Sequence, residues 1–127
     1  MGHITGLHHV SMKTRNADEH ARVVHFYRDT LGLRVARTWD GGIMFDTGNG
    51  LIEVFENGTG EPEQGIIRHF AFAVDDVDAC AKDVAQAGYP VFLGPKDIEI
   101  PSSPVFPARI AFCTGPLNEQ IELFEEK

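Results

Sequence analysis

The chain has 127 residues, of which 43% are hydrophobic and 24% charged, and these values are typical of one globular domain with its own core. Its formal net charge of −8 argues against nucleic acid and anionic membranes as partners, because both bind clustered positive charge. The two cysteines, Cys80 and Cys113, have neither metal-binding nor disulfide-framework spacing. No signal peptide or membrane-length apolar run is present, so the expected compartment is the cytoplasm.

The first half of the chain predicts a strand, a helix and three more strands. Residues 7–13 alternate in polarity and predict a strand in which His9 and His8 face opposite sides; a slip of one residue would exchange them. Asn16, with a glutamate three positions later, is a capping box that begins a helix, and Gly32 is the expected stop. The remaining strands of this half are expected at 33–39, 43–47 and 51–55.

The second half predicts the same order of elements after a turn-rich linker at about 57–65. A strand is expected at 66–74, followed by a helix capped by Asp75 and ended by Gly88. Further strands are expected at 89–93, 109–114 and 120–124. Residues 94–107 contain four prolines, which predicts either a surface loop with an edge hairpin or a lid over a pocket.

A pentapeptide occurs twice, as Ile52-Glu53-Val54-Phe55-Glu56 and as Ile121-Glu122-Leu123-Phe124-Glu125. Repetition of this kind indicates a duplicated supersecondary unit. Aligning the copies makes His9 equivalent to His69 and Glu53 equivalent to Glu122. We therefore expect one domain over 1–127 built from two βαβββ modules, at about 4–56 and 66–126.

Each module thus contributes one histidine from its first strand and one glutamate from its last. Two imidazoles and two carboxylates suit a divalent transition metal, and an open coordination position would make such a site catalytic. The alternative for each single residue is ordinary: a strand histidine usually packs and hydrogen bonds, and a glutamate is usually solvated. Glu53 and Glu122 each lie between two apolar neighbours, where a charge usually needs a partner.

The pattern resembles the vicinal oxygen chelate superfamily, which includes glyoxalase I, extradiol dioxygenases, methylmalonyl-CoA epimerase and fosfomycin- and bleomycin-resistance proteins. The resemblance is to its glyoxalase I-like members and spans nearly the whole chain. It implies an α+β fold in which two tandem βαβββ modules form an open, U-shaped mixed sheet around a metal-binding cavity. The stretches that carry it are Leu7-His8-His9-Val10, His25-Phe26-Tyr27-Arg28-Asp29-Thr30-Leu31-Gly32-Leu33, Arg68-His69-Phe70-Ala71-Phe72-Ala73-Val74-Asp75-Asp76 and the two repeated pentapeptides.

By position, the resemblance implies His9, Glu53, His69 and Glu122 as ligands of one divalent metal, Zn, Ni, Co or Fe. The carboxylate at position 53 favours lyase or isomerase chemistry over the two-histidine, one-carboxylate site of extradiol dioxygenases. Glu122 is then the base that removes a proton next to a metal-bound carbonyl, and Glu53 completes the shell.

The substrate is expected to be a small oxygenated molecule, and the short connection between the modules argues against a glutathione hemithioacetal. Lys13 and Arg109 are candidates for binding its anionic group, or are simply solvated or salt-bridged. Phe55 and Phe124 are candidate lining residues, with Phe45 and Phe106 as further ones, unless these rings belong to the core.

The resemblance also implies a homodimer, with the cavity built within one chain or across two. Two kinds of rival remain. One is an Fe(II) extradiol-type dioxygenase or an epimerase on the same scaffold. The other is a metal-free binding protein of the bleomycin-resistance kind. Metal content separates these classes.

Overall fold

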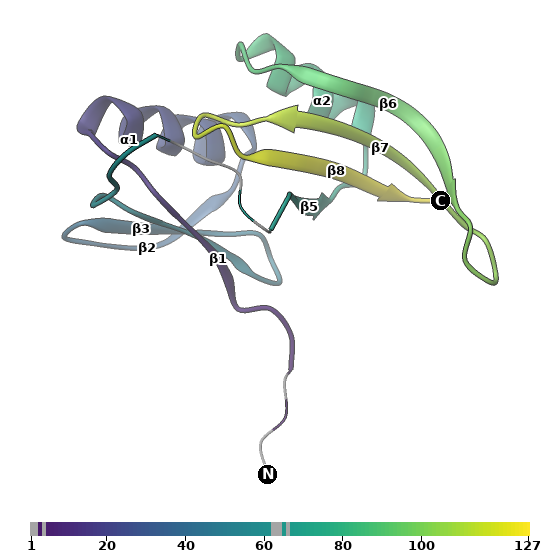
Figure 1. Ribbon diagram of the computed structural model, residues 1–127, viewed down its shortest axis with the longest axis horizontal. Coiled ribbons are helices and arrows are strands. Elements are labelled where there is room, and N and C mark those ends of the chain that lie inside the picture. Colours follow the sequence, from purple (N-terminus) through teal and green to yellow (C-terminus); the bar gives the residue numbers. More distant parts are fainter. Residues whose placement is uncertain (1–2, 4, 62–64, 66) are drawn as a thin grey trace. The chain divides into compact units, whose positions relative to one another are not determined.

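The computed structural model describes residues 3, 5–61, 65 and 67–127. They fall into two compact units that divide between residues 60 and 61. Within the described residues, each unit contains one four-stranded mixed sheet and a helical segment (Figure 1). The predicted α+β class and the two tandem βαβββ modules are therefore confirmed. We call the units module one and module two.

Module one places its first strand beside its last. The sheet order is β1-β4-β3-β2, and β1 runs parallel to β4. The helix begins as predicted, because the Asn16 side chain accepts a hydrogen bond of 2.9 Å from the Glu19 amide. Its elements are β1 (His9–Lys13), α1 (Ala17–Val24), the π-helical η1 (His25–Thr30), β2 (Arg34–Trp39), β3 (Gly42–Asp46) and β4 (Leu51–Phe55).

The core of module one lies between its sheet and its helical segment. Ile52 pairs with Phe45 across β4 and β3, and the Phe45 ring stacks on Tyr27 of η1 with centroids 5.7 Å apart. Phe45 is fully buried, so it is a core residue and not a lining residue of a pocket. Because side chains alternate along a strand, Glu53 must lie on the opposite, helix-free face of the sheet.

Module two repeats the arrangement with the order β5-β8-β7-β6 and with β5 parallel to β8. Its helix is capped by Asp76 and not by Asp75, because the Asp76 carboxylate accepts a bond of 3.0 Å from the Ala79 amide. The first strand is shorter than predicted, and residue 66 lies outside the described residues. The elements are β5 (Phe70–Ala73), α2 (Val77–Gln86), β6 (Val91–Ile100), β7 (Phe106–Thr114) and β8 (Gln120–Glu126).

The proline-rich segment at 94–107 forms a long β6–β7 hairpin, visible at one edge of module two (Figure 1). Only residues 101–105 connect its strands, so most of this segment is strand and not loop. Pro95 is tolerated because β6 is the edge strand and the pairing shifts between Leu93 and Lys96. Gly94 is required beside it: its φ is +76°, and a Cβ there would lie 2.5 Å from the Ile110 carbonyl oxygen.

The core of module two lies between α2 and its sheet. On β8, Ile121 and Leu123 are fully buried, and Glu125 on the same face accepts a hydrogen bond from the Val77 amide at the start of α2. The face that carries Glu122 is therefore the one that α2 does not cover. Among the described residues, no helix is long and apolar enough to cross a membrane.

Candidate metal centre

Each module brings one histidine and one glutamate together on its helix-free sheet face. In module one, His9 Nε2 lies 3.5 Å from Glu53 Oε1. In module two, His69 Nε2 lies 3.3 Å from Glu122 Oε1. The two contacts join equivalent residues of the two modules, as the repeat predicts.

The parallel strand pairing explains both contacts. His9 on β1 pairs with Leu51, two residues before Glu53 on β4. In module two, Glu122 pairs with Ala71 on β5, and His69 lies two residues before Ala71. The offset between histidine and glutamate is therefore the same in both modules. Residues two apart on a strand share a face, and neighbouring strands lie about 4.8 Å apart, so each imidazole reaches its carboxylate diagonally.

The two pairs also match in their exposure. The side chains of Glu53 and Glu122 are only 11% and 12% exposed, whereas those of His9 and His69 are 37% and 40% exposed. The carboxylates are thus held within the sheet surface, and the imidazoles extend from it. Such a pair is accessible to an incoming ligand from the histidine side.

The spacing within each pair fits a shared metal ion. Nitrogen–oxygen distances of 3.3 and 3.5 Å exceed the usual range for a hydrogen bond. Two ligand atoms bound to one ion at about 2.1 Å are separated by about 3.0 Å in an octahedral site and about 3.4 Å in a tetrahedral one. Each pair therefore suits one edge of a coordination shell, made of the donors that transition metals prefer.

Within either module, only two of the four predicted ligands lie together. Among the residues that the structure describes, no group of three or more His, Cys, Asp or Glu side chains is arranged to hold a metal ion. The structure places the four predicted ligands in two separate pairs, His9 with Glu53 and His69 with Glu122. A four-ligand centre requires the two pairs to meet.

Two of the predicted substrate-binding residues of module one share the face of Glu53. Lys13 pairs with Phe55 across β1 and β4. This pair lies two residues further along both strands than the pair formed by Ser11 and Glu53, and so on the same face. The Phe55 ring meets Trp39 edge to face, with centroids 5.7 Å apart. A cationic and an apolar side chain thus lie next to this carboxylate.

In module two, the surroundings of Glu122 are aromatic. Phe112 pairs directly with Glu122, and Phe124 lies two positions further on the same face. The Phe112 ring also contacts His69 edge to face at 5.1 Å. Phe106, the further lining candidate, contacts Phe124 at 6.0 Å and so belongs to this face. Phe112 was not predicted, although it occupies the position opposite Glu122, as Met44 occupies the position opposite Glu53 in module one.

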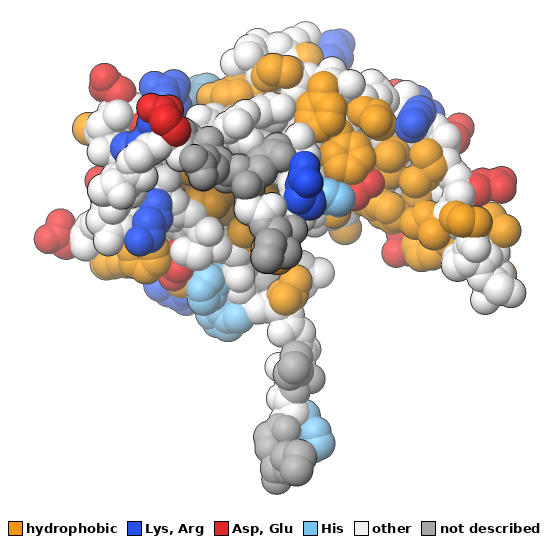
Figure 2. All heavy atoms as spheres, viewed as in Figure 1, with side chains coloured by type: hydrophobic (Ala, Val, Ile, Leu, Met, Phe, Trp, Pro, Cys, Tyr) orange, Lys and Arg blue, Asp and Glu red, His pale blue; other side chains and the backbone are white. Residues whose placement is uncertain are grey.

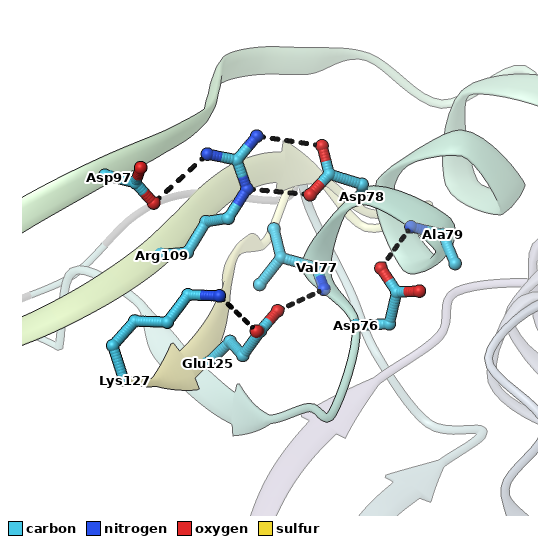
Figure 3. A network of polar contacts seen from close by, with 8 residues as sticks. All are labelled: Asp76, Val77, Asp78, Ala79, Asp97, Arg109, Glu125 and Lys127. Carbon is cyan, nitrogen blue, oxygen red and sulfur yellow. Dashed lines mark hydrogen bonds and ion pairs between the residues drawn. The ribbon is translucent and has the colours of Figure 1, made fainter.

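Arg109 lies on the opposite face of module two and is not brought together with Glu122. It pairs with Glu125 across β7 and β8, and its guanidinium bonds both Asp78 on α2 and Asp97 on β6 at distances of 2.7–3.2 Å (Figure 3). The hydrogen bond from Arg109 lowers the pKa of Asp78. Arg109 therefore ties the helix to the edge strand, which is the salt-bridged alternative that the sequence left open for this residue.

His8 differs from the prediction. It lies just before β1 begins, and alternation would place it on the face opposite His9. Its ring turns toward His9: the two Nδ1 atoms are 2.9 Å apart, and the ring centroids are 5.1 Å apart. The expectation that His8 faces away from His9 is therefore wrong.

Comparison with known proteins identifies the family of the chain. Residues 6–122 match the family described as the Glyoxalase/Bleomycin resistance protein/Dioxygenase superfamily. No curated protein sequence gives a significant match. Solved structures share the fold at low identity.

Three such structures illustrate the likeness. A glyoxalase/bleomycin resistance protein/dioxygenase from Alicyclobacillus acidocaldarius is 21% identical, with 96% of this chain and 92% of that chain covered and a TM-score of 0.67. The lactoylglutathione lyase from Agrobacterium tumefaciens is 20% identical, with coverages of 96% and 94% and a TM-score of 0.66. The fosfomycin resistance protein FosX from Mesorhizobium loti is 21% identical, with coverages of 98% and 95% and a TM-score of 0.65. Since the family match spans most of its length, the chain belongs to the Glyoxalase/Bleomycin resistance protein/Dioxygenase superfamily.

Proposed function

We propose that this protein is a metal-dependent lyase or isomerase of the glyoxalase I type, which removes a proton next to a carbonyl of a small oxygenated substrate. The observation that carries the proposal is the matched His–Glu pair, which recurs in both modules with the same register offset and nearly the same spacing. Proteins of this superfamily are largely enzymes and commonly bind a divalent metal.

In this proposal the two pairs, His9 with Glu53 and His69 with Glu122, together hold one Zn, Ni, Co or Fe ion. When bound, the ion would act as a Lewis acid that polarises the substrate carbonyl. The pairs come together either within one chain or across a homodimer, an assembly that members of the superfamily often form.

The surroundings of the two glutamates support different roles for them. Glu122 lies between Ala71 and Phe112 on the neighbouring strands, which are both apolar, although its exposure of 12% matches the 11% of Glu53. Glu53 lies between Ser11 and Met44 on the neighbouring strands. We therefore assign the proton transfer to Glu122 and a ligand role to Glu53.

Substrate binding is assigned to residues of the same faces. The Lys13 ammonium, beside Phe55, would pair with a carboxylate or phosphate of the substrate, and Phe55 and Phe124 would contact its apolar part. Arg109 has no part in this assignment, because both of its acidic partners hold it on the α2 face.

A second candidate function is metal-free binding of an apolar ligand, as in bleomycin-resistance proteins. Hydrophobic side chains gather over the part of module two that carries β6, β7 and β8 (Figure 2). Phe92 is 51% exposed and Phe106 37% exposed, and their rings contact Phe112 and Phe124. An exposed apolar surface of this kind fits sequestration of a ligand as well as catalysis.

Metal analysis of purified, untagged protein separates the two candidates. The enzyme proposal expects a stoichiometric divalent ion that is lost in His69→Ala and retained in His25→Ala, whose histidine is 67% exposed and serves as the control. Metal-loaded protein is then screened against hemithioacetals, 2-oxo acids and acyl-CoA thioesters in deuterated water. Deuterium uptake next to the carbonyl supports proton abstraction. Absence of a bound ion, together with unchanged ion uptake in Glu122→Gln, would refute the enzyme proposal.

Oxygen consumption separates an extradiol-type dioxygenase from the proposed lyase or isomerase. An extradiol-type dioxygenase loaded with Fe(II) would consume oxygen in the presence of a catechol, whereas a lyase or isomerase would not. We expect no oxygen consumption by the Fe(II)-loaded protein. Catechol-dependent consumption at a catalytic rate would replace the lyase proposal with the dioxygenase.

A further inference from the structure

The His8 and His9 rings are in contact, although the side chains of successive residues in a strand point to opposite faces. Their Nδ1 atoms lie 2.9 Å apart, which is within hydrogen-bonding distance, and their rings meet at an interplanar angle of 83°. The other ring nitrogen of His9, Nε2, is the atom that lies 3.5 Å from Glu53. His8 therefore contacts the side of the His9 ring that is remote from the carboxylate.

This contact restricts the tautomers of both rings. A bond between two Nδ1 atoms requires one donor and one acceptor, and a neutral imidazole carries its proton on only one nitrogen. If His8 donates, His9 carries its proton on Nε2, facing Glu53. If His9 donates, its Nε2 is unprotonated and has a lone pair available for a ligand.

We infer that His8 is a positioning residue for His9: it accepts the Nδ1–H bond that fixes the tautomer and ring orientation in which His9 Nε2 can bind a metal. The inference rests on the proposed metal site. Histidine ligands are commonly oriented by an acceptor on their second nitrogen, usually a carboxylate or carbonyl oxygen. Here the acceptor is a second imidazole supplied by the preceding residue.

The protons balance when the ion binds. In the metal-free protein we expect His9 to carry Nε2–H toward the Glu53 carboxylate, because a lone pair in that position would face negative charge. Its Nδ1 then accepts from His8. For His9 Nε2 to hold an ion, its proton would leave to water, the shared proton would pass from His8 Nδ1 to His9 Nδ1, and His8 Nε2 would take one proton from water.

Module two holds its histidine by a different contact. The His69 ring packs edge to face against Phe112, which has no hydrogen-bond acceptor of this kind. The two pairs are thus alike in their metal-facing atoms and differ in what stands behind the imidazole. Replacing His8 should therefore affect the tautomer of His9 and leave that of His69 unchanged.

The test compares wild type with His8→Ala, His8→Asn and the surface control His25→Ala. Asparagine can place a side-chain oxygen near the position of Nδ1, so it should restore the acceptor. Zn²⁺ affinity is measured by competition with a chelator, and the tautomers are measured by ¹⁵N–¹H correlation spectra of the imidazoles. Circular dichroism confirms that each variant is folded.

We expect His8→Ala to weaken Zn²⁺ binding by about 10- to 100-fold, the usual effect of losing such a partner. His8→Asn should recover most of the affinity, and His25→Ala should match wild type. On Zn²⁺ binding, the His9 proton should move from Nε2 to Nδ1. Wild-type affinity and an unchanged His9 tautomer in His8→Ala would overturn this inference alone. Failure of wild-type protein to bind any divalent ion would overturn the proposed function, and this inference with it.

Discussion

Replacing Glu122 with glutamine tests the assignment of the moving proton. The two side chains have nearly the same size, and the amide keeps an oxygen that can occupy the position 3.3 Å from His69 Nε2. Since this side chain is only 12% exposed and its neighbours are Phe112 and Phe124, an isosteric change should leave the fold intact. What is lost is the negative charge and the ability to accept a proton.

The expected loss in kcat is about 10²- to 10⁴-fold, the usual contribution of a positioned general base, which corresponds to about 2.7–5.4 kcal/mol in the activation barrier. The assay is deuterium exchange next to the carbonyl of the best substrate from the screen, at saturating metal and substrate. Glu53→Gln is the matched control, since its side chain is 11% exposed and 3.5 Å from His9. We expect a weaker effect of Glu53→Gln on kcat at saturating metal. Equal losses in the two variants would refute the division of roles.

Three further predictions concern stability and reactivity. Glu19 is buried, and its hydrogen bond from Arg15 lowers its pKa below the usual value of 4.5; Glu19→Gln should cost about 1–3 kcal/mol near neutral pH. Because the carboxylate is favoured in the folded state, that difference in urea denaturation should shrink as the pH falls through the pKa of folded Glu19, and a constant difference would contradict this. Gly94→Ala should destabilise by about 1–3 kcal/mol in the same assay, since its φ is +76° and the added Cβ meets a carbonyl; wild-type stability would contradict it. Burial raises the pKa of Cys113 to about 12, so in a Cys80→Ser background a disulfide reagent should modify it only after unfolding, and rapid modification of native protein would contradict this.

The contacts of His9 with Glu53 and of His69 with Glu122 were predictable because they depend on properties that the sequence carries directly. The repeated pentapeptide aligns Glu53 with Glu122, and period-two alternation places both on the face opposite the buried neighbours. The histidines follow because each lies on or just before the strand that pairs in parallel with the last strand of its module. Local periodicity and duplication were sufficient for these contacts.

Other features depend on where an element begins and on which face of the sheet a helix covers. The contact between the His8 and His9 rings was not predicted, because it depends on side-chain torsions that strand alternation does not define. The choice between the two roles of Arg109 stayed open because period-two alternation defines two faces without saying which of them α2 covers. The predicted strands of the β6–β7 hairpin were too short. Prolines disfavour central strands, but they are tolerated at the edge position that β6 occupies.

The central claim is that the two His–Glu pairs hold one ion together, and metal stoichiometry tests it most directly. Wild-type protein is compared with His9→Ala from module one and His69→Ala from module two, each equilibrated with Zn²⁺ and freed of unbound ion. We predict one ion per chain in wild type and loss of that ion in each variant, because each module supplies only half of the coordination shell. Retention of a full equivalent after either single substitution would contradict the account.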